Sequence, residues 1–276
     1  LRLPWPLRLL FALGCGMVLV SLFRDESWSD RFSPVYGDSF HLWAPNEGVK
    51  DSGLIAGLMK LSWAAHVGQV QPDVALVERF REDNAQAMAQ RRARPVPAVL
   101  PDVVIVQSES LFDPADLRGI EPSDVMPEFR RLTARGLSGR LQVPTFAGGT
   151  IRTEYELLTG YPLEAFPAVE YPYLGIALQT PTSLARALAP FGYEAIVLHP
   201  FQRAFWNRED ALRALGFDRM LFDDAFVDAP THGRYISDAA LFERMLQLLP
   251  ETGPPQLMLA ITMENHGPWN RERGLA

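Results

Sequence analysis

The spacing of hydrophobic and polar positions changes several times along this chain of 276 residues, starting with an uncharged apolar stretch from Leu9 to Phe23. A helix that spans a bilayer needs about 20 mostly apolar residues. The stretch reaches this length if the helix begins near Leu3 and the Arg8 side chain extends to the membrane surface. We therefore predict a transmembrane helix over residues 1–24, with its start in the cytoplasm because basic residues precede it.

Two other interpretations of this stretch remain open. A basic flank and a short apolar run also occur in cleaved signal peptides, but the residues after Phe23 lack the small-x-small pattern that cleavage needs. A buried core helix has a similar composition, although Gly14 and Gly16 are more typical of membrane helices than of soluble ones. For these reasons we favour the membrane helix.

Residues 25–100 predict a juxtamembrane connector. Aromatic residues alternate with proline and glycine over residues 28–48, a composition suited to the membrane interface. Apolar residues at helical spacing predict a helix over residues 52–67, and a charged, solvated helix follows over residues 74–94. A proline-rich stretch then ends this helix and marks the start of a domain over residues 101–276.

In this domain, strand patterns alternate with helix patterns. Runs rich in β-branched or apolar residues predict strands buried on both faces over residues 102–110, 194–200 and 257–263. The predicted helices cover residues 127–135, 150–159, 182–189, 208–215 and 237–249. Strands separated by helices of this length predict an α/β fold, with a mainly parallel sheet and helices on both faces.

Polar side chains follow each predicted strand. In parallel sheets, ligands bind outside the carboxyl ends of the strands. A single histidine at a strand end is most often a hydrogen-bonded structural residue, but several polar groups at one edge predict a functional site. The side chains at this edge are Gln107, Ser108, Glu109, Ser110, His199, Glu264, Asn265 and His266.

Two further stretches carry candidate chemistry. Thr150 follows two glycines and begins a predicted helix, so it is either an N-cap or a nucleophile that needs a cation or base for activation. In the stretch FWNRED, Arg208 could bind a phosphate through two hydrogen bonds, and the flat Trp206 ring could form one side of a site for a small headgroup. The alternative is that Trp206 packs in the core and Arg208 pairs with Glu209 or Asp210 at the surface.

The composition of the chain argues against some partners and excludes some kinds of site. The chain has 26 basic and 33 acidic residues, for a net charge of −7, which argues against a nucleic-acid partner. Its single cysteine, Cys15, excludes an internal disulfide and a zinc site built on several cysteines. Any metal must therefore be held by oxygen and imidazole ligands.

Five motifs together resemble the lipoteichoic acid synthase-like phosphoglycerol transferases, which are sulfatase-like members of the alkaline phosphatase superfamily. The motifs, in chain order, are VVIVQSES, GGTIRTEYELLTG, VLHP, FWNRED and ITMENHGPW. The resemblance implies an anchor in the cytoplasmic membrane and an extracytoplasmic catalytic domain with the alkaline phosphatase/sulfatase-like fold. It also implies a divalent cation, Mn²⁺ or Mg²⁺, with Zn²⁺ as a further option.

The resemblance also assigns roles by position. Glu109 resembles the metal-binding glutamate, and Thr150 resembles the metal-bound nucleophile that becomes phosphorylated. His266 resembles the active-site histidine that faces the departing or entering oxygen. The residues that resemble those around the phosphoglycerol group are His199, Trp206 and Arg208.

The implied reaction moves a phosphoglycerol headgroup from phosphatidylglycerol in the lipid bilayer to a glycan or polymer acceptor, through a phosphothreonine intermediate. A phosphoethanolamine transferase of the same superfamily and a non-catalytic membrane scaffold on a degenerate domain are the alternatives. A sulfatase is disfavoured because the chain has TIRTE where that activity needs a C/S-x-P-x-R motif.

The sequence departs from the family at its end. The remaining metal ligands of the family form an Asp-His pair after a further strand, and the residues after His266 contain no such pair. The chain also begins with leucine. We therefore expect a piece of a longer protein that stops inside the catalytic domain and carries half of the metal shell.

Overall fold

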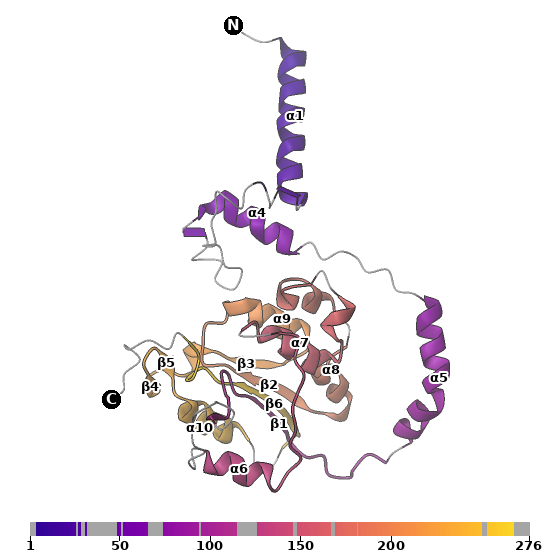
Figure 1. The fold of residues 1–276 in the computed structure, drawn as a ribbon, viewed down its shortest axis with the longest axis vertical. Coiled ribbons are helices and arrows are strands. Elements are labelled where there is room, and N and C mark those ends of the chain that lie inside the picture. The colour runs from indigo at the N-terminus through magenta and orange to yellow at the C-terminus, as the bar shows by residue number, and fades with distance from the viewer. Residues whose placement is uncertain are drawn as a thin grey trace.

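The computed structural model describes residues 4–25, 27–28, 31, 49–50, 52–65, 74–93, 95–114, 126–145, 148–166, 169–180, 182–249 and 253–267. The aromatic-rich part of the predicted connector, residues 32–48, lies outside the described residues. Figure 1 shows the first two labelled N-terminal helices at one end of the molecule and an α/β domain at the other, with a third helix to the side of the domain.

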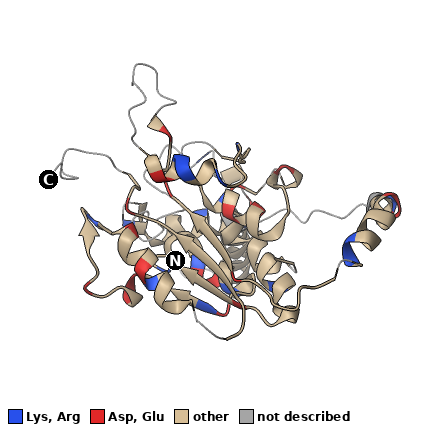
Figure 2. Ribbon diagram, turned by 90° about the horizontal axis from the view of Figure 1, so that it is seen from below, with Lys and Arg blue, Asp and Glu red and all other residues tan. Residues whose placement is uncertain are grey.

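Among the described residues, three long helices precede the domain. Helix α1 (Trp5–Arg24) is apolar and has no buried residue, and it is long and apolar enough to cross a membrane. Helix α4 (Leu54–Ala65) packs against the end of α1, whereas α5 (Val74–Arg92) carries charges of both signs along its length (Figure 2). The three helices agree with the predicted elements to within a few residues at their ends.

In the described part of the domain, a parallel sheet has four strands in the order β1-β6-β2-β3. These strands are β1 (Val103–Gln107), β6 (Gln256–Ile261), β2 (Glu194–Leu198) and β3 (Arg219–Leu221). The mainly parallel sheet was predicted, but β3 was not, because three residues are too few to show a period. A hairpin of β4 (Thr231–His232) and β5 (Tyr235–Ile236) stands apart from this sheet.

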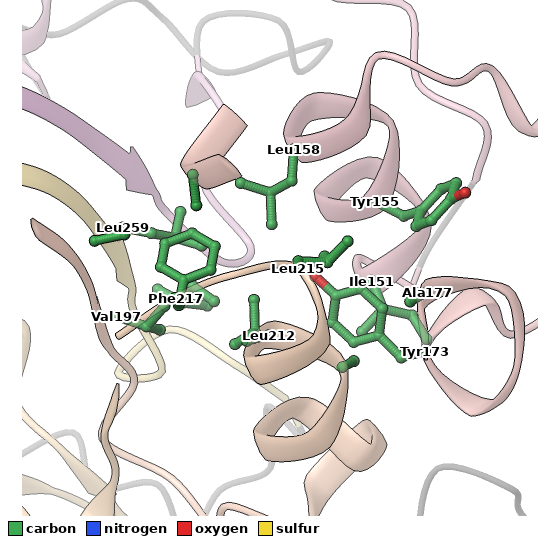
Figure 3. Close-up of a cluster of buried hydrophobic side chains, with 14 of the residues drawn as sticks. Ile151, Tyr155, Leu158, Tyr173, Ala177, Val197, Leu212, Leu215, Phe217 and Leu259 are labelled. Carbon is green, nitrogen blue, oxygen red and sulfur yellow. The ribbon is translucent and has the colours of Figure 1, made fainter. Parts of the chain in front are cut away.

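Helices cover both faces of the sheet (Figure 1). On one face, side chains of α7 (Ile151–Thr159), α8 (Leu184–Leu188) and α9 (Arg208–Ala214) pack on β2 and β6, and Figure 3 shows part of this core. On the other face, α10 (Asp238–Leu248) packs on the alternate residues of the same strands. The other helices described in the domain are α6 (Pro127–Thr133) and short 3₁₀ turns at Leu163–Ala165, Pro172–Leu174, Ile176–Gln179, Ala189–Phe191, Phe205–Asn207 and Asp223–Ala225.

The expectation that all three predicted strands are buried on both faces is correct for β2 and β6 and wrong for β1. Val103 and Ile105 pack toward the core, but Val104 and Val106 are 42% and 44% exposed. The reason is position: among the described strands β1 lies at the edge of the sheet, so it has a partner on one side only. A run of valine and isoleucine does not distinguish an edge strand from a central one.

Candidate active site

The carboxyl end of β1 places Glu109 beside the start of α7. The Glu109 side chain is buried, and its backbone N–H donates to Thr262 Oγ1 at 3.0 Å, just beyond the end of β6. The following residue, Ser110, has a φ of 59°, a left-handed conformation that turns the chain sharply away from the sheet. The carboxylate is thus held at the sheet edge where a ligand is expected in this fold.

Thr150 faces Glu109 and does not cap its own helix. Its Oγ1 donates to Glu109 Oε1 at 2.8 Å, and its side chain makes no capping hydrogen bond. Gly149, at φ 64°, brings the chain into the helix in a conformation that favours glycine. Of the two interpretations of this threonine, the geometry supports the one in which the hydroxyl belongs to the site.

Behind this pair lies a buried ion pair between Arg208 and Glu154, whose side chains are 1% and 0% exposed. Arg208 Nη2 donates to Glu154 Oε1 at 2.5 Å, and Nε donates to Oε2 at 3.3 Å. Burial disfavours the charged form of Arg208, but the two nearby glutamates outweigh this effect and raise its pKa. Neither Glu209 nor Asp210, the surface partners considered from the sequence, takes this role.

Tyr173 completes the surroundings of Glu154. Its hydroxyl donates to Glu154 Oε2 at 3.1 Å. Burial, together with the neighbouring carboxylate, raises the pKa of Tyr173 well above its ordinary value of 10.0. The phenol therefore stays protonated and remains a hydrogen-bond donor.

His199 is fixed in one neutral tautomer by its two neighbours. Arg208 Nη1, which can only donate, lies 3.1 Å from His199 Nε2, so Nε2 accepts. Nδ1 then carries the proton and donates to the carbonyl oxygen of Ile261 at 3.2 Å. Burial, reinforced by the Arg208 charge, holds the pKa of His199 well below its ordinary value of 6.5.

Gln107 joins the two carboxylates. Its Nε2 donates to Glu109 Oε1 and to Glu154 Oε1, both at 3.0 Å. Arg208 Nη2 lies 3.9 Å from Glu109 Oε1, so the Arg208 guanidinium is close to both the Glu109 and the Glu154 carboxylates. We call Gln107, Glu109, Thr150, Glu154 and Arg208 the carboxylate network. This network couples the position of Thr150 to groups in the core.

Trp206 packs in the core of the domain, with 8% of its surface exposed. Its ring stacks on Tyr171 with centroids 5.3 Å apart. Trp206 and Asn207 have φ values of 59° and 55°, and Asn207 Nδ2 donates to the carbonyl oxygen of Tyr173 at 3.0 Å. Two successive left-handed residues without glycine are uncommon and occur mostly where surrounding contacts hold them.

His266 lines a hollow at the same sheet edge. This cavity of about 280 Å³ has mainly aromatic walls, including Phe201, Phe205 and Tyr235. His266 Nδ1 donates to the carbonyl oxygen of Gly267 at 3.0 Å, so the lone pair of the neutral ring lies on Nε2. The ring can thus accept a proton there.

Glu264 plays a structural part instead. Its Oε2 accepts from the backbone N–H of Asp238 at 2.6 Å at the start of α10, and its Oε1 lies 3.1 Å from His232 Nδ1. Asp238 Oδ1 in turn accepts from the backbone N–H of Glu264 at 3.3 Å. These contacts join α10 and the hairpin to the end of β6.

The donors at Glu109 and Thr150 suit a hard divalent cation. A carboxylate oxygen and a hydroxyl oxygen in contact are the ligand types that Mg²⁺ and Mn²⁺ prefer. Within the described ranges, no three His, Cys, Asp or Glu side chains gather as a metal-binding group. The described residues thus offer two oxygen ligands of the expected chemistry.

Sequence reasoning missed Glu154 and Tyr173 as parts of the site. A usable signal was present, because Glu154 shares the buried face of α7 with Ile151, Tyr155 and Leu158. An acid on an apolar helix face needs a buried partner, which here is Arg208.

The depressed pKa of His199 predicts a loss of stability in acid. Below pH 6.5 the unfolded chain binds a proton that the folded protein excludes, so the free energy of unfolding falls by about 1.4 kcal/mol per pH unit. Above that pH both states are neutral and the effect vanishes. We expect the free energy of unfolding, measured in urea, to fall less steeply between about pH 7.5 and 5.5 in His199→Asn than in the natural protein. Equal slopes would contradict a buried neutral His199.

Comparisons with known proteins place the chain in a family. The Sulfatase family matches residues 101–275. A Rhizobium meliloti protein named for cyclic beta-1,2-glucan modification is 31% identical over 195 residues, covering 68% of this chain and 30% of the relative. The capsular polysaccharide biosynthesis protein RkpI of the same organism is 35% identical over 183 residues, covering 63% of this chain and 33% of the relative. This chain therefore spans about a third of the length of either relative.

A solved structure has a similar fold. The phosphoglycerol transferase GacH of Streptococcus pyogenes, in complex with sn-glycerol-1-phosphate, superposes with a TM-score of 0.60 at 25% identity. The match covers 71% of this chain and 52% of that structure. The chain belongs to the Sulfatase family, within the alkaline phosphatase superfamily, and has a phosphoglycerol transferase as a structural neighbour.

Proposed function

We propose that this chain is part of a membrane-anchored transferase that moves a phosphoglycerol headgroup from phosphatidylglycerol to a glycan or polymer acceptor. The observation that carries the proposal is the 2.8 Å hydrogen bond from Thr150 Oγ1 to the buried Glu109 carboxylate at the sheet edge. The GacH neighbour, a phosphoglycerol transferase bound to sn-glycerol-1-phosphate, supports the choice of headgroup.

Thr150 is the nucleophile of the first step. Its oxygen attacks the phosphorus of the donor, a Thr150–phosphorus ester bond forms, and the bond from phosphorus to the diacylglycerol oxygen breaks. A divalent cation held by Glu109 and Thr150 would make the hydroxyl more acidic and offset charge on the phosphate. The proton of the hydroxyl passes to a nearby base or water.

His266 serves both leaving and entering oxygens. In the first step its protonated ring gives a proton to the diacylglycerol oxygen, which leaves as the alcohol. In the second step the neutral ring takes the proton of an acceptor hydroxyl, whose oxygen attacks phosphorus as the bond to Thr150 breaks. The Nδ1 contact to Gly267 leaves Nε2 as the atom that exchanges the proton.

The carboxylate network orients the nucleophile. Gln107 and the Arg208–Glu154 pair hold the Glu109 carboxylate, which in turn fixes the direction of the Thr150 hydroxyl. Positioning of this kind lowers the entropic cost of reaching the reactive geometry. His199, Trp206 and Arg208 stay our candidates for surrounding the phosphoglycerol group.

The membrane helix supplies the link to a lipid donor. With α1 in the cytoplasmic membrane and the domain on the extracytoplasmic side, the site is confined near a surface where phosphatidylglycerol is concentrated. The acceptor is then a glycan or polymer of the cell envelope, in keeping with the glucan and capsule names of the two relatives.

The test uses the protein from its complete natural reading frame, reconstituted with phosphatidylglycerol or phosphatidylethanolamine labelled in the headgroup. We expect a phosphoglycerol adduct on the peptide that contains Thr150, detected by mass spectrometry, and label in an added glycan. An adduct from phosphatidylethanolamine instead would assign the phosphoethanolamine reaction. No adduct from either lipid, with the metal ions supplied, would favour a non-catalytic scaffold and overturn the proposal.

A further inference from the structure

Helix α4 is apolar on two opposite faces. Ala56, Met59 and Trp63, spaced three and four residues apart, are buried. On the other side Leu54 and Ile55 are 63% and 69% exposed, and Leu58, one turn on, is 46% exposed. The helix sequence LIAGLMKLSWAA contains one charged residue and no acid. Such a helix is expected to have apolar surroundings on both sides.

The buried face of α4 is fastened to the last turn of α1. Ser62 Oγ donates to the carbonyl oxygen of Phe23 at 2.7 Å, and Trp63 Nε1 donates to the carbonyl oxygen of Leu22 at 3.0 Å. The last carbonyls of a helix have no partner within the helix and must find one elsewhere. Here α4 supplies two of those partners, so its position relative to the end of α1 is fixed by specific bonds.

The position of that last turn sets the depth of α4. Twenty residues of α-helix span about 30 Å, the thickness of the hydrocarbon core, so the end of α1 lies at the headgroup level. The indole rings of Trp63 and of Trp28, whose Nε1 donates to Ser21 Oγ at 2.9 Å, lie at this end of the helix. Tryptophan is enriched at this level of a membrane. Figure 1 shows α4 lying across the end of α1 instead of continuing its axis.

We propose that α4 is an interfacial helix, which lies along the bilayer surface with Leu54, Ile55 and Leu58 inserted among the acyl chains. The lipid bilayer is the one partner that the position of α4 selects, because α4 is bonded to the last turn of α1 and carries its exposed apolar side chains within about two helical turns of those bonds. The proposal rests on α1 spanning the bilayer and is independent of the reaction that the domain catalyses.

Site-specific fluorescence tests this placement in the protein from its complete reading frame. Cys15 and any cysteine outside residues 1–276 are replaced by serine, and single cysteines introduced at Ile55, Leu58, Leu13 and Glu82 are labelled with an environment-sensitive dye. Each is exposed, so labelling leaves the core intact. The protein is reconstituted in vesicles of phosphatidylglycerol and phosphatidylcholine, and quenching by brominated lipid is compared with quenching by aqueous iodide.

We expect labels at positions 55 and 58 to resemble the α1 label at position 13, with bromolipid quenching several-fold above that of the α5 label at position 82. Iodide quenching should show the reverse order. Iodide access at position 55 equal to that at position 82 would place α4 in water and overturn the proposal. Protection at position 55 from both quenchers would overturn it too, because the face would then be covered by protein. Iodide access at position 13 would show that α1 does not span the bilayer, and it would therefore also overturn the proposal.

Discussion

Replacing Thr150 by alanine is expected to abolish phosphoglycerol transfer while leaving the domain folded. The alanine has no oxygen to attack phosphorus, so the loss should reach about 10⁴-fold or more. Stability should change by only about 1 kcal/mol, because the hydroxyl makes one hydrogen bond to Glu109 and does not cap α7. Headgroup transfer and thermal unfolding are measured on the same preparations.

Two control variants separate chemistry from folding. Thr153→Ala changes another threonine of the same helix and should retain transfer. Thr150→Ser keeps a hydroxyl at the same backbone position and should retain part of the activity. Transfer by Thr150→Ala at the natural rate would refute the nucleophile assignment, whatever the other variants do.

Glu154→Ala is expected to destabilise the domain strongly. It leaves the Arg208 guanidinium, 1% exposed, without its main counter-charge. Breaking a buried pair by removing one partner costs about 3–5 kcal/mol. It also removes an acceptor from Gln107 and from Tyr173. Urea unfolding followed by near-ultraviolet circular dichroism measures the change.

The matched control is Glu128→Ala, which removes an exposed acid that pairs with Arg131 on α6. Such a surface pair contributes about 0–1 kcal/mol. The double variant Glu154→Leu with Arg208→Met removes both charges and should recover much of the lost stability. A cost for Glu154→Ala as small as that for Glu128→Ala would show that Arg208 finds another partner.

The sequence was informative wherever a pattern repeats or a chemical group has few alternatives. The helical period and the apolar runs predicted α1, α7, α10, β2 and β6, and with them the parallel sheet. The strand ends then predicted that Glu109, His199 and His266 lie at one edge. Local patterns sufficed there because strand direction follows from the alternation of strands and helices.

The parts that were not predicted depend on contacts between distant segments. Arg208 and Glu154 are 54 residues apart, and no local pattern joins them. The exposed valines of β1 follow from the strand order, which is set by packing of the whole sheet. The capping of α1 by α4 likewise connects residues about 40 positions apart. Each of these contacts depends on how distant segments pack together, which the hydrophobic period of one segment does not show.

The left-handed turn at Trp206 and Asn207 makes the position of Arg208 sensitive to substitutions elsewhere in the domain. Its two residues adopt a backbone conformation that costs energy for any side chain but glycine, and Arg208 follows at once. Stacking on Tyr171 and the Asn207 contact to Tyr173 offset that cost. The location of the buried Arg208 guanidinium therefore depends on Tyr171 and Tyr173, so a substitution at either aromatic residue is expected to shift a cation that lies 30 or more positions further along the chain.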